Sequence, residues 1–140
     1  MNNEFKQCIK DRHLLSINAS KEMIQKELDS AEFDVERSKD STADEDYKWA
    51  TIQAYYSMFH AAKALVLQKG FREKSHYCLI VALKELYVKK GLLSSETVEN
   101  IELCLRLRHD ADYGLIYEKD SAEIAIHYAE SFLLKAKKLL

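Results

Sequence analysis

The chain has 140 residues and a formal net charge of −2, with 47% hydrophobic and 31% charged residues. This balance is typical of a soluble globular domain that buries a core, and it argues against a disordered chain or a basic nucleic-acid coat protein. The chain has no proline and only three glycines, which favours an all-α fold over a β-rich one. We therefore expect a single helical domain over residues 1–140.

The first half of the chain predicts three helices. A short amphipathic helix is expected over Glu4–Ile17, and Ser20 is placed to cap a second helix that runs to about Lys39. The polar stretch Asp40–Asp44 is expected to be a loop. A long helix then spans about Asp46–Lys69, on the order of 35 Å at 1.5 Å per residue.

The second half predicts up to three more helices. Their expected spans are Ser75 to about Lys90, Ser94 or Ser95 to Tyr113, and Ser121 to the C-terminus. A glycine follows three of the predicted helices, where a left-handed residue often ends a helix. These residues are Gly70, Gly91 and Gly114. The elements together predict a bundle of about five to six helices with a long central helix.

The long helix has two different apolar faces, which predicts a central position with neighbours around it. One face is a stripe of small residues: Ala50, Ala54, Ser57, Ala61 and Ala64. The other is bulky: Trp49, Ile52, Tyr56, Phe59, Val66 and Leu67. His60 and Lys63 fall within the bulky face, and we interpret them as a hydrogen-bonded core histidine and a lysine whose stem lies along apolar surface. A catalytic role for either is the less favoured alternative.

The segment LRHDADYG, Leu107–Gly114, carries the most informative pattern of charges. Helical phase places Arg108 near the centre of an apolar face, which consists of Val98, Ile101, Cys104, Leu105 and Ala111. Asp112 lies one turn further on, while Arg106 and Asp110 fall on the polar side. Two interpretations remain open for Arg108: an ion pair with Asp112 that fixes helix packing, or a guanidinium held by a carboxylate and directed at a phosphate.

A second polar segment lies between two predicted helices. Ser75 and His76 stand at a predicted helix N-terminus, where free N–H groups and the helix dipole favour anions. Arg72 and Lys74 precede them and add positive charge. These residues are candidates for phosphate binding, and the alternative is an ordinary capped turn in solvent.

The cysteines and the N-terminus favour a cytoplasmic protein. The chain has three cysteines, an odd number without paired spacing: Cys8, Cys78 and Cys104. The N-terminus lacks a signal-peptide core, and no apolar run is long enough for a membrane span. His60, His76, Cys78 and Cys104 lack the short ligand spacing of structural zinc sites. We therefore expect neither a metal site nor a cofactor.

Three motifs together resemble the HEPN family (higher eukaryotes and prokaryotes nucleotide-binding), and most closely its small stand-alone prokaryotic branch. They are AYYSMFHAAKAL (54–65), GFREKSHYCLIVAL (70–83) and LRHDADYG (107–114), and the likeness extends over essentially the whole chain. The resemblance implies an up-and-down helical bundle that forms a homodimer. It also implies a partner, since prokaryotic relatives are often encoded beside a minimal nucleotidyltransferase as the toxin half of a toxin–antitoxin pair.

The resemblance further implies an RNA-directed site. Relatives that cut RNA do so without metal and carry Arg-x4–6-His on a late helix; Arg108 matches the arginine, and Asp112 and Tyr113 match the ADY of this branch. Tyr113 occupies the position of the histidine, and a tyrosine with a pKa of about 10 is a poor general base near neutral pH. Either His76 or His60 supplies the base, or Tyr113 acts as a donor or a modification site.

Three hypotheses follow for the function. The first is a metal-independent endoribonuclease with Arg108 on the phosphate. The second is a catalytically inactive module that binds RNA or a nucleotide and pairs with a nucleotidyltransferase. The third is a purely structural helical dimer. We favour a toxin-like HEPN subunit and leave its enzymatic competence open.

Overall fold

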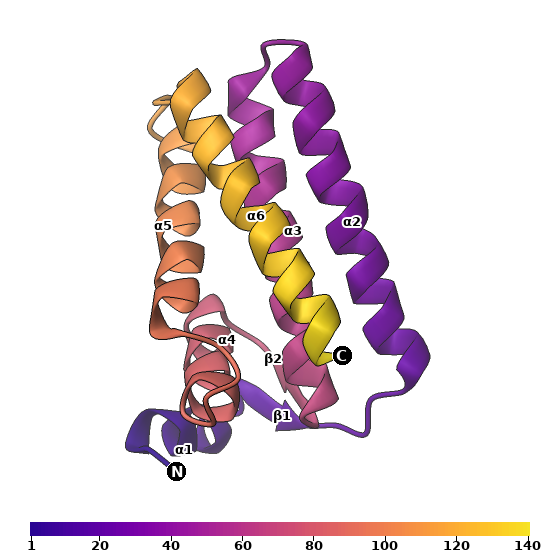
Figure 1. Cartoon of the computed structure of the whole chain (residues 1–140). Helices are drawn as coiled ribbons and strands as arrows, with labels where there is room; N and C mark the ends of the chain where they lie inside the picture. Colours follow the sequence, from indigo (N-terminus) through magenta and orange to yellow (C-terminus); the bar gives the residue numbers. More distant parts are fainter.

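The structure, a computed structural model, describes residues 1–140 as six α-helices and one small antiparallel sheet (Figure 1). The helices are α1 (Asn3–Lys10), α2 (Lys21–Ala43), α3 (Tyr47–Gln68), α4 (His76–Leu83), α5 (Ser95–Asp112) and α6 (Lys119–Leu139). α4 continues into a π-helical turn, η1 (Lys84–Val88), and the strands are β1 (Leu14–Ser16) and β2 (Phe71–Glu73). The predicted helical bundle is confirmed, with the sheet as a minor addition.

Helix α3 is the centre of the bundle, as its two apolar faces predicted. It packs against α2, α5 and α6, and Figure 1 shows these four helices along one another, with α1 and the sheet at one end. All five members of the small-residue stripe, from Ala50 to Ala64, are fully buried. Small side chains allow close helix approach, and the Ser57 hydroxyl uses that proximity to donate to the Ala31 carbonyl of α2 at 2.7 Å.

The predicted helix starts are largely correct because their caps form. Ser20, Ser75 and Ser94 each accept a hydrogen bond at 3.1 Å from the backbone N–H three residues later. The predicted loop at Asp40–Asp44 is wrong, because α2 continues to Ala43. A polar residue of this stretch bonds back to the helix: the Thr42 hydroxyl donates to the Ser38 carbonyl at 3.0 Å.

The predicted first helix, Glu4–Ile17, is also too long. α1 ends at Lys10, and Arg12 has a positive φ of 60°, which a continuing helix does not allow. Leu14–Ser16 instead pairs with Phe71–Glu73, with Leu14 opposite Glu73. Tertiary pairing thus overrides an apolar pattern that fits a helix equally well.

The connection between α5 and α6 differs from prediction in two details. Gly114 does not take the left-handed conformation; Leu115 does, with φ 56°. Gly114 is instead favoured by close packing, since a Cβ there would lie 3.1 Å from the Asp110 carbonyl oxygen. α6 begins at Lys119, two residues before the predicted Ser121.

Two of the three cysteines are joined, although the sequence showed no paired spacing. Cys8 and Cys78 form a disulfide that joins α1 to α4, with their Cα atoms 5.8 Å apart, while Cys104 is free and buried. The two partners are 70 residues apart in sequence, so local spacing gave no sign of the pair. None of the helices is both long and apolar enough to span a membrane.

Candidate functional site

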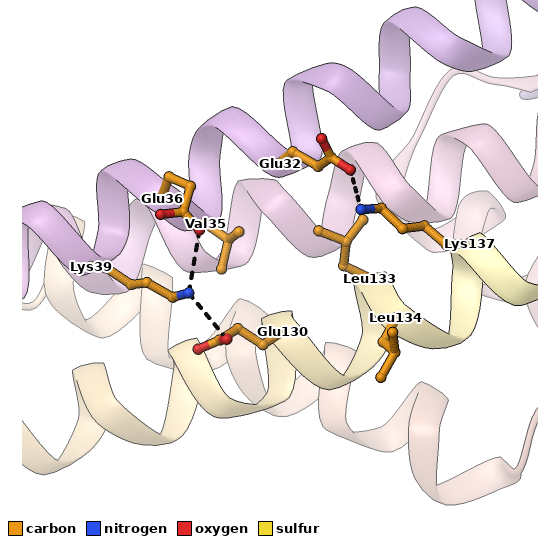
Figure 2. Close-up of a pocket in the computed structure, with 8 residues that line it drawn as sticks. All are labelled: Glu32, Val35, Glu36, Lys39, Glu130, Leu133, Leu134 and Lys137. Atoms are coloured by element: carbon orange, nitrogen blue, oxygen red, sulfur yellow. Dashed lines mark hydrogen bonds and ion pairs between the residues drawn. The ribbon is translucent and has the colours of Figure 1, made fainter.

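Charged side chains gather in the groove between α2 and α6, and Figure 2 shows them. Lys39 Nζ lies 3.1 Å from Glu130 Oε2 and 3.3 Å from Glu36 Oε1, and Lys137 pairs with Glu32. With Val35, Leu133 and Leu134 these five residues line a depression of about 310 Å³. We call it the α2–α6 seam. Its cations are already paired with carboxylates, so it resembles a clamp between helices more than a binding site.

Arg108 lies in a different environment on α5. Its side chain is only 15% exposed; Nη2 donates to the Tyr56 hydroxyl at 2.9 Å and lies 3.6 Å from Asp112 Oδ2. The predicted inward orientation and the pairing with Asp112 are therefore confirmed. The prediction that Arg106 and Asp110 are exposed is also confirmed.

The guanidinium of Arg108 is surrounded by aromatic rings and is not fully hydrogen bonded. Its carbon lies 5.4 Å from the ring centre of Tyr56 and 5.6 Å from that of Tyr113. Its Nε is buried and has no partner. Buried donors are nearly always satisfied, so an unpaired one calls for an explanation, and an incomplete binding site is one such explanation. Tyr113 itself is 71% exposed and stacks against His109.

His76 is brought to the same region from the start of α4. Its Nδ1 lies 2.5 Å from the Tyr55 hydroxyl, and its ring stacks on Phe59 with 4.7 Å between ring centres. Partial burial, and then the positive charges of Arg108 and His109, lower the pKa of His76. Since the Tyr55 and Tyr56 rings are in contact at 5.6 Å, a continuous set of side chains links His76 to Arg108.

We call this set the Arg108 surface. It consists of Tyr55, Tyr56, Phe59, His76, Arg108, Asp112 and Tyr113. Sequence reasoning missed Tyr55, whose partner His76 is 21 residues away on another helix. The only available signal was the spacing of Tyr55 and Phe59, which lie one helical turn apart and stack their rings.

The other candidates in the 71–76 segment are less closely connected to this surface. The Ser75 hydroxyl caps α4 by accepting from the Cys78 N–H, as predicted. Arg72 and Lys74 are exposed, and their side chains form neither an ion pair nor a hydrogen bond with Arg108 or His76. Of this segment, only His76 joins the Arg108 surface.

His60 and Lys63 belong to an ionic cluster that joins α3 to α2 and β2, and it touches the Arg108 surface at Phe59, whose ring centre lies 5.3 Å from Lys63 Nζ. His60 Nδ1 lies 2.7 Å from Glu27 Oε2, and Lys63 Nζ lies 3.6 Å from Glu27 Oε1 and 3.8 Å from Glu73 Oε1. Burial alone would raise the pKa of Glu27, but His60 and Lys63 hold it below its ordinary value. The interpretation of His60 as a hydrogen-bonded histidine is confirmed, although its position is half-buried and not in the core.

Known proteins resemble this chain in sequence and in fold. "Putative toxin MJ0142" of Methanocaldococcus jannaschii is 34% identical over 122 residues, which cover 86% of this chain and 83% of that protein. A "UPF0332 protein" of Archaeoglobus fulgidus is 38% identical over 94 residues, or 65% of this chain and 74% of its own. The crystal structure of TT1696 from Thermus thermophilus has a TM-score of 0.71 at 20% identity, covers 84% of this chain and 98% of its own, and supports the fold alone.

A family model also matches most of the chain. The HEPN domain matches residues 24–139, from the first turn of α2 to the end of α6. This span includes every residue of the Arg108 surface. The chain therefore belongs to the HEPN-domain family.

Proposed function

We propose that this HEPN protein is the toxin-like subunit of a toxin–antitoxin pair, and that its Arg108 surface binds the phosphates of single-stranded RNA or of a nucleotide. The observation that carries the proposal is the state of Arg108, which is largely buried among aromatic rings with Nε unpartnered. The names of two relatives, "Putative toxin MJ0142" and "Putative toxin MJ0605", support the toxin-like role.

The chemistry of the surface suits a nucleic-acid strand. A guanidinium binds phosphate through paired N–H donors, and exposed rings such as Tyr113 provide faces on which bases stack. His76 adds a titratable nitrogen beside the arginine. A metal-independent endoribonuclease is the enzymatic form of the proposal, with Arg108 on the phosphate.

We propose two partners in the cytoplasm, a second copy of the chain and a minimal nucleotidyltransferase. A group of exposed apolar side chains follows the Arg108 surface along the chain, and protein contact commonly covers such groups. Its members are Leu115, Ile116, Tyr117 and Ile124. A nucleotidyltransferase seated there would lie next to Tyr113, the residue it would modify. Co-expression followed by size-exclusion chromatography tests both partners, and elution as a lone monomer would contradict them.

The RNA-directed role is tested with the purified protein and a single-stranded RNA oligonucleotide in EDTA. We expect RNA binding, and Arg108→Ala should weaken it by about tenfold or more while leaving the circular dichroism spectrum unchanged. Arg106→Ala is the matched control, because Arg106 lies on the exposed side of the same helix. Strand cleavage in the same reactions would establish the nuclease, and binding without cleavage would establish the inactive module.

The remaining alternative, a purely structural dimer, predicts a different result. A ligand that binds the native state raises the melting temperature by mass action. If neither RNA nor any nucleotide raised it, and Arg108→Ala and Arg106→Ala behaved alike, the proposed function would be wrong.

A further inference from the structure

The hydrogen bond between Tyr55 and His76 determines more than the position of the imidazole ring. A neutral imidazole has one nitrogen that donates and one that accepts, so the partner at Nδ1 decides what Nε2 presents. The Tyr55 hydroxyl lies 2.5 Å from His76 Nδ1, whereas Nε2 of this exposed histidine forms no hydrogen bond or ion pair with the protein.

The direction of this hydrogen bond follows from burial. Tyr55 is only 2% exposed, and His76 Nδ1 is the one side-chain partner of its hydroxyl. If Nδ1 carried the proton, the Tyr55 O–H would be buried without an acceptor, at a cost of about 1–3 kcal/mol. Burial also raises the pKa of Tyr55, so the hydroxyl keeps its proton. The hydroxyl therefore donates, and Nδ1 accepts.

We infer that Tyr55 is a positioning residue that holds neutral His76 in its Nε2–H tautomer, so that His76 donates a hydrogen bond to a phosphate oxygen and does not act as a general base. The phosphate part of this inference rests on the proposed function. The Arg108 surface then presents two donors, the guanidinium and Nε2–H, which suits an anionic ligand.

The charges around His76 agree with a neutral donor. The titratable or charged groups that face it are Tyr55 from α3, and Arg108 and His109 from α5. Burial and the positive charge of Arg108 lower the pKa of His76, which favours the neutral ring near pH 7. A neutral ring can still bind phosphate if Nε2 carries the proton, and the hydrogen bond from Tyr55 to Nδ1 secures that condition.

Long-range proton–nitrogen NMR of the unliganded protein tests the tautomer directly. At a pH where His76 is neutral, we expect Nε2 to carry the proton, with the His76 signals assigned from a His76→Gln variant. A proton on Nδ1 would overturn the inference. Because no RNA is present, this outcome is independent of the proposed function.

Tyr55→Phe and Tyr87→Phe form a matched pair for the positioning role. Both remove one buried hydroxyl, but the Tyr87 hydroxyl donates to the Leu65 carbonyl at 2.6 Å, away from His76. Tyr55→Phe should give mixed tautomers and raise the pKa of His76, because the neutral form loses its stabilising bond. Tyr87→Phe should leave the His76 signals unchanged. Unchanged His76 signals in Tyr55→Phe would contradict the inference.

Binding of a single-stranded RNA oligonucleotide across the titration of His76 supplies the second readout. His76 carries a proton on Nε2 both when it is protonated and when Tyr55 fixes its neutral tautomer. Tyr55→Phe and wild type should therefore bind RNA with equal affinity below the pKa of His76. Above the pKa of His76 the variant should bind RNA more weakly, by about twofold for an equal mixture of tautomers, because only the Nε2–H form donates to the phosphate. An equal loss at every pH would indicate a merely structural role for Tyr55 and would overturn the inference.

Discussion

The α2–α6 seam and the Arg108 surface both place charged side chains between helices, and they use them in opposite ways. In the seam, Lys39 and Lys137 each face a carboxylate across the helix interface and remain 41% and 45% exposed. Arg108 is 15% exposed, has one carboxylate at 3.6 Å and keeps an unpartnered Nε. The difference shows that unmet hydrogen-bonding capacity, and not the density of charge, distinguishes a candidate site from a structural clamp.

The neighbours of the charges differ as well. Leucine and valine side chains line the seam, whereas the rings of Tyr56 and Tyr113 flank Arg108. Aliphatic neighbours offer packing alone. Aromatic faces also attract cations and stack on planar ligands, so they extend what an arginine can bind.

The largest expected effect concerns the disulfide that ties α4 to α1. The α2–α6 seam has no such covalent link. Replacing Cys8 and Cys78 by serine should lower the free energy of unfolding by about 2–4 kcal/mol, because the disulfide closes a long loop of chain. Chemical denaturation of the variant and the wild type measures this. The positions of the His76 NMR signals should also change, since α4 begins two residues before Cys78. Equal denaturation midpoints would show that the constraint is dispensable.

Arg108→Ala comes next and should separate binding from stability. Loss of a charge-assisted contact to phosphate, worth about 1.5–3 kcal/mol, should weaken RNA affinity by about tenfold or more. The unfolding free energy should fall by about 1–2 kcal/mol, since the variant loses the ion pair with Asp112 and the hydrogen bond to Tyr56. Fluorescence anisotropy and urea denaturation measure the two quantities. A large loss of stability with unchanged affinity would place Arg108 with the seam residues.

An intermediate effect on stability is expected at Glu27, which belongs neither to the α2–α6 seam nor to the Arg108 surface. Its folded-state pKa is lowered, so its contribution is present above its ordinary pKa of 4.5 and is lost as pH falls through the folded value. Glu27→Gln should therefore cost about 1 kcal/mol at neutral pH, and the difference from wild type should shrink in acid. Thermal unfolding at several pH values checks this, and a difference independent of pH would contradict it.

The smallest effect is expected in the seam. Lys39→Ala should lower the unfolding free energy by about 0.2–1 kcal/mol, and added salt should reduce that difference, since both partners are exposed. RNA affinity should stay at the wild-type value. A marked loss of RNA affinity in Lys39→Ala would mean that the seam is itself part of a binding surface.

The fold was predictable wherever local chemistry decides the structure. Serine caps set the starts of α2, α4 and α5, and helical phase placed the small-residue stripe of α3 against its neighbours. The prediction was wrong where a distant partner decides. Leu14–Ser16 becomes a strand only because Phe71–Glu73 lies beside it, and the pairing of Cys8 with Cys78 has the same origin.

The candidate site was also predictable only where contacts lie within one helix. The inward direction of Arg108 and its pairing with Asp112 follow from positions on one helix, so they could be predicted. The contact of Arg108 with Tyr56 and the bond between Tyr55 and His76 depend on how α3, α4 and α5 pack. No spacing within one helix contains that information.

The disulfide closes residues 8–78 into a covalent ring, which a long C-terminal tail follows. The ring runs from Cys8 to Cys78 and contains α2, α3, both strands and the residues Tyr55 and His76, whereas Arg108 and all of α6 lie in the tail. If α5 and α6 detached from the ring, Arg108 would leave Tyr56 while the Tyr55–His76 bond, which lies wholly within the ring, stayed intact. The two donors of the Arg108 surface are thus supplied by separate halves of the molecule, and docking of the tail on the ring assembles them.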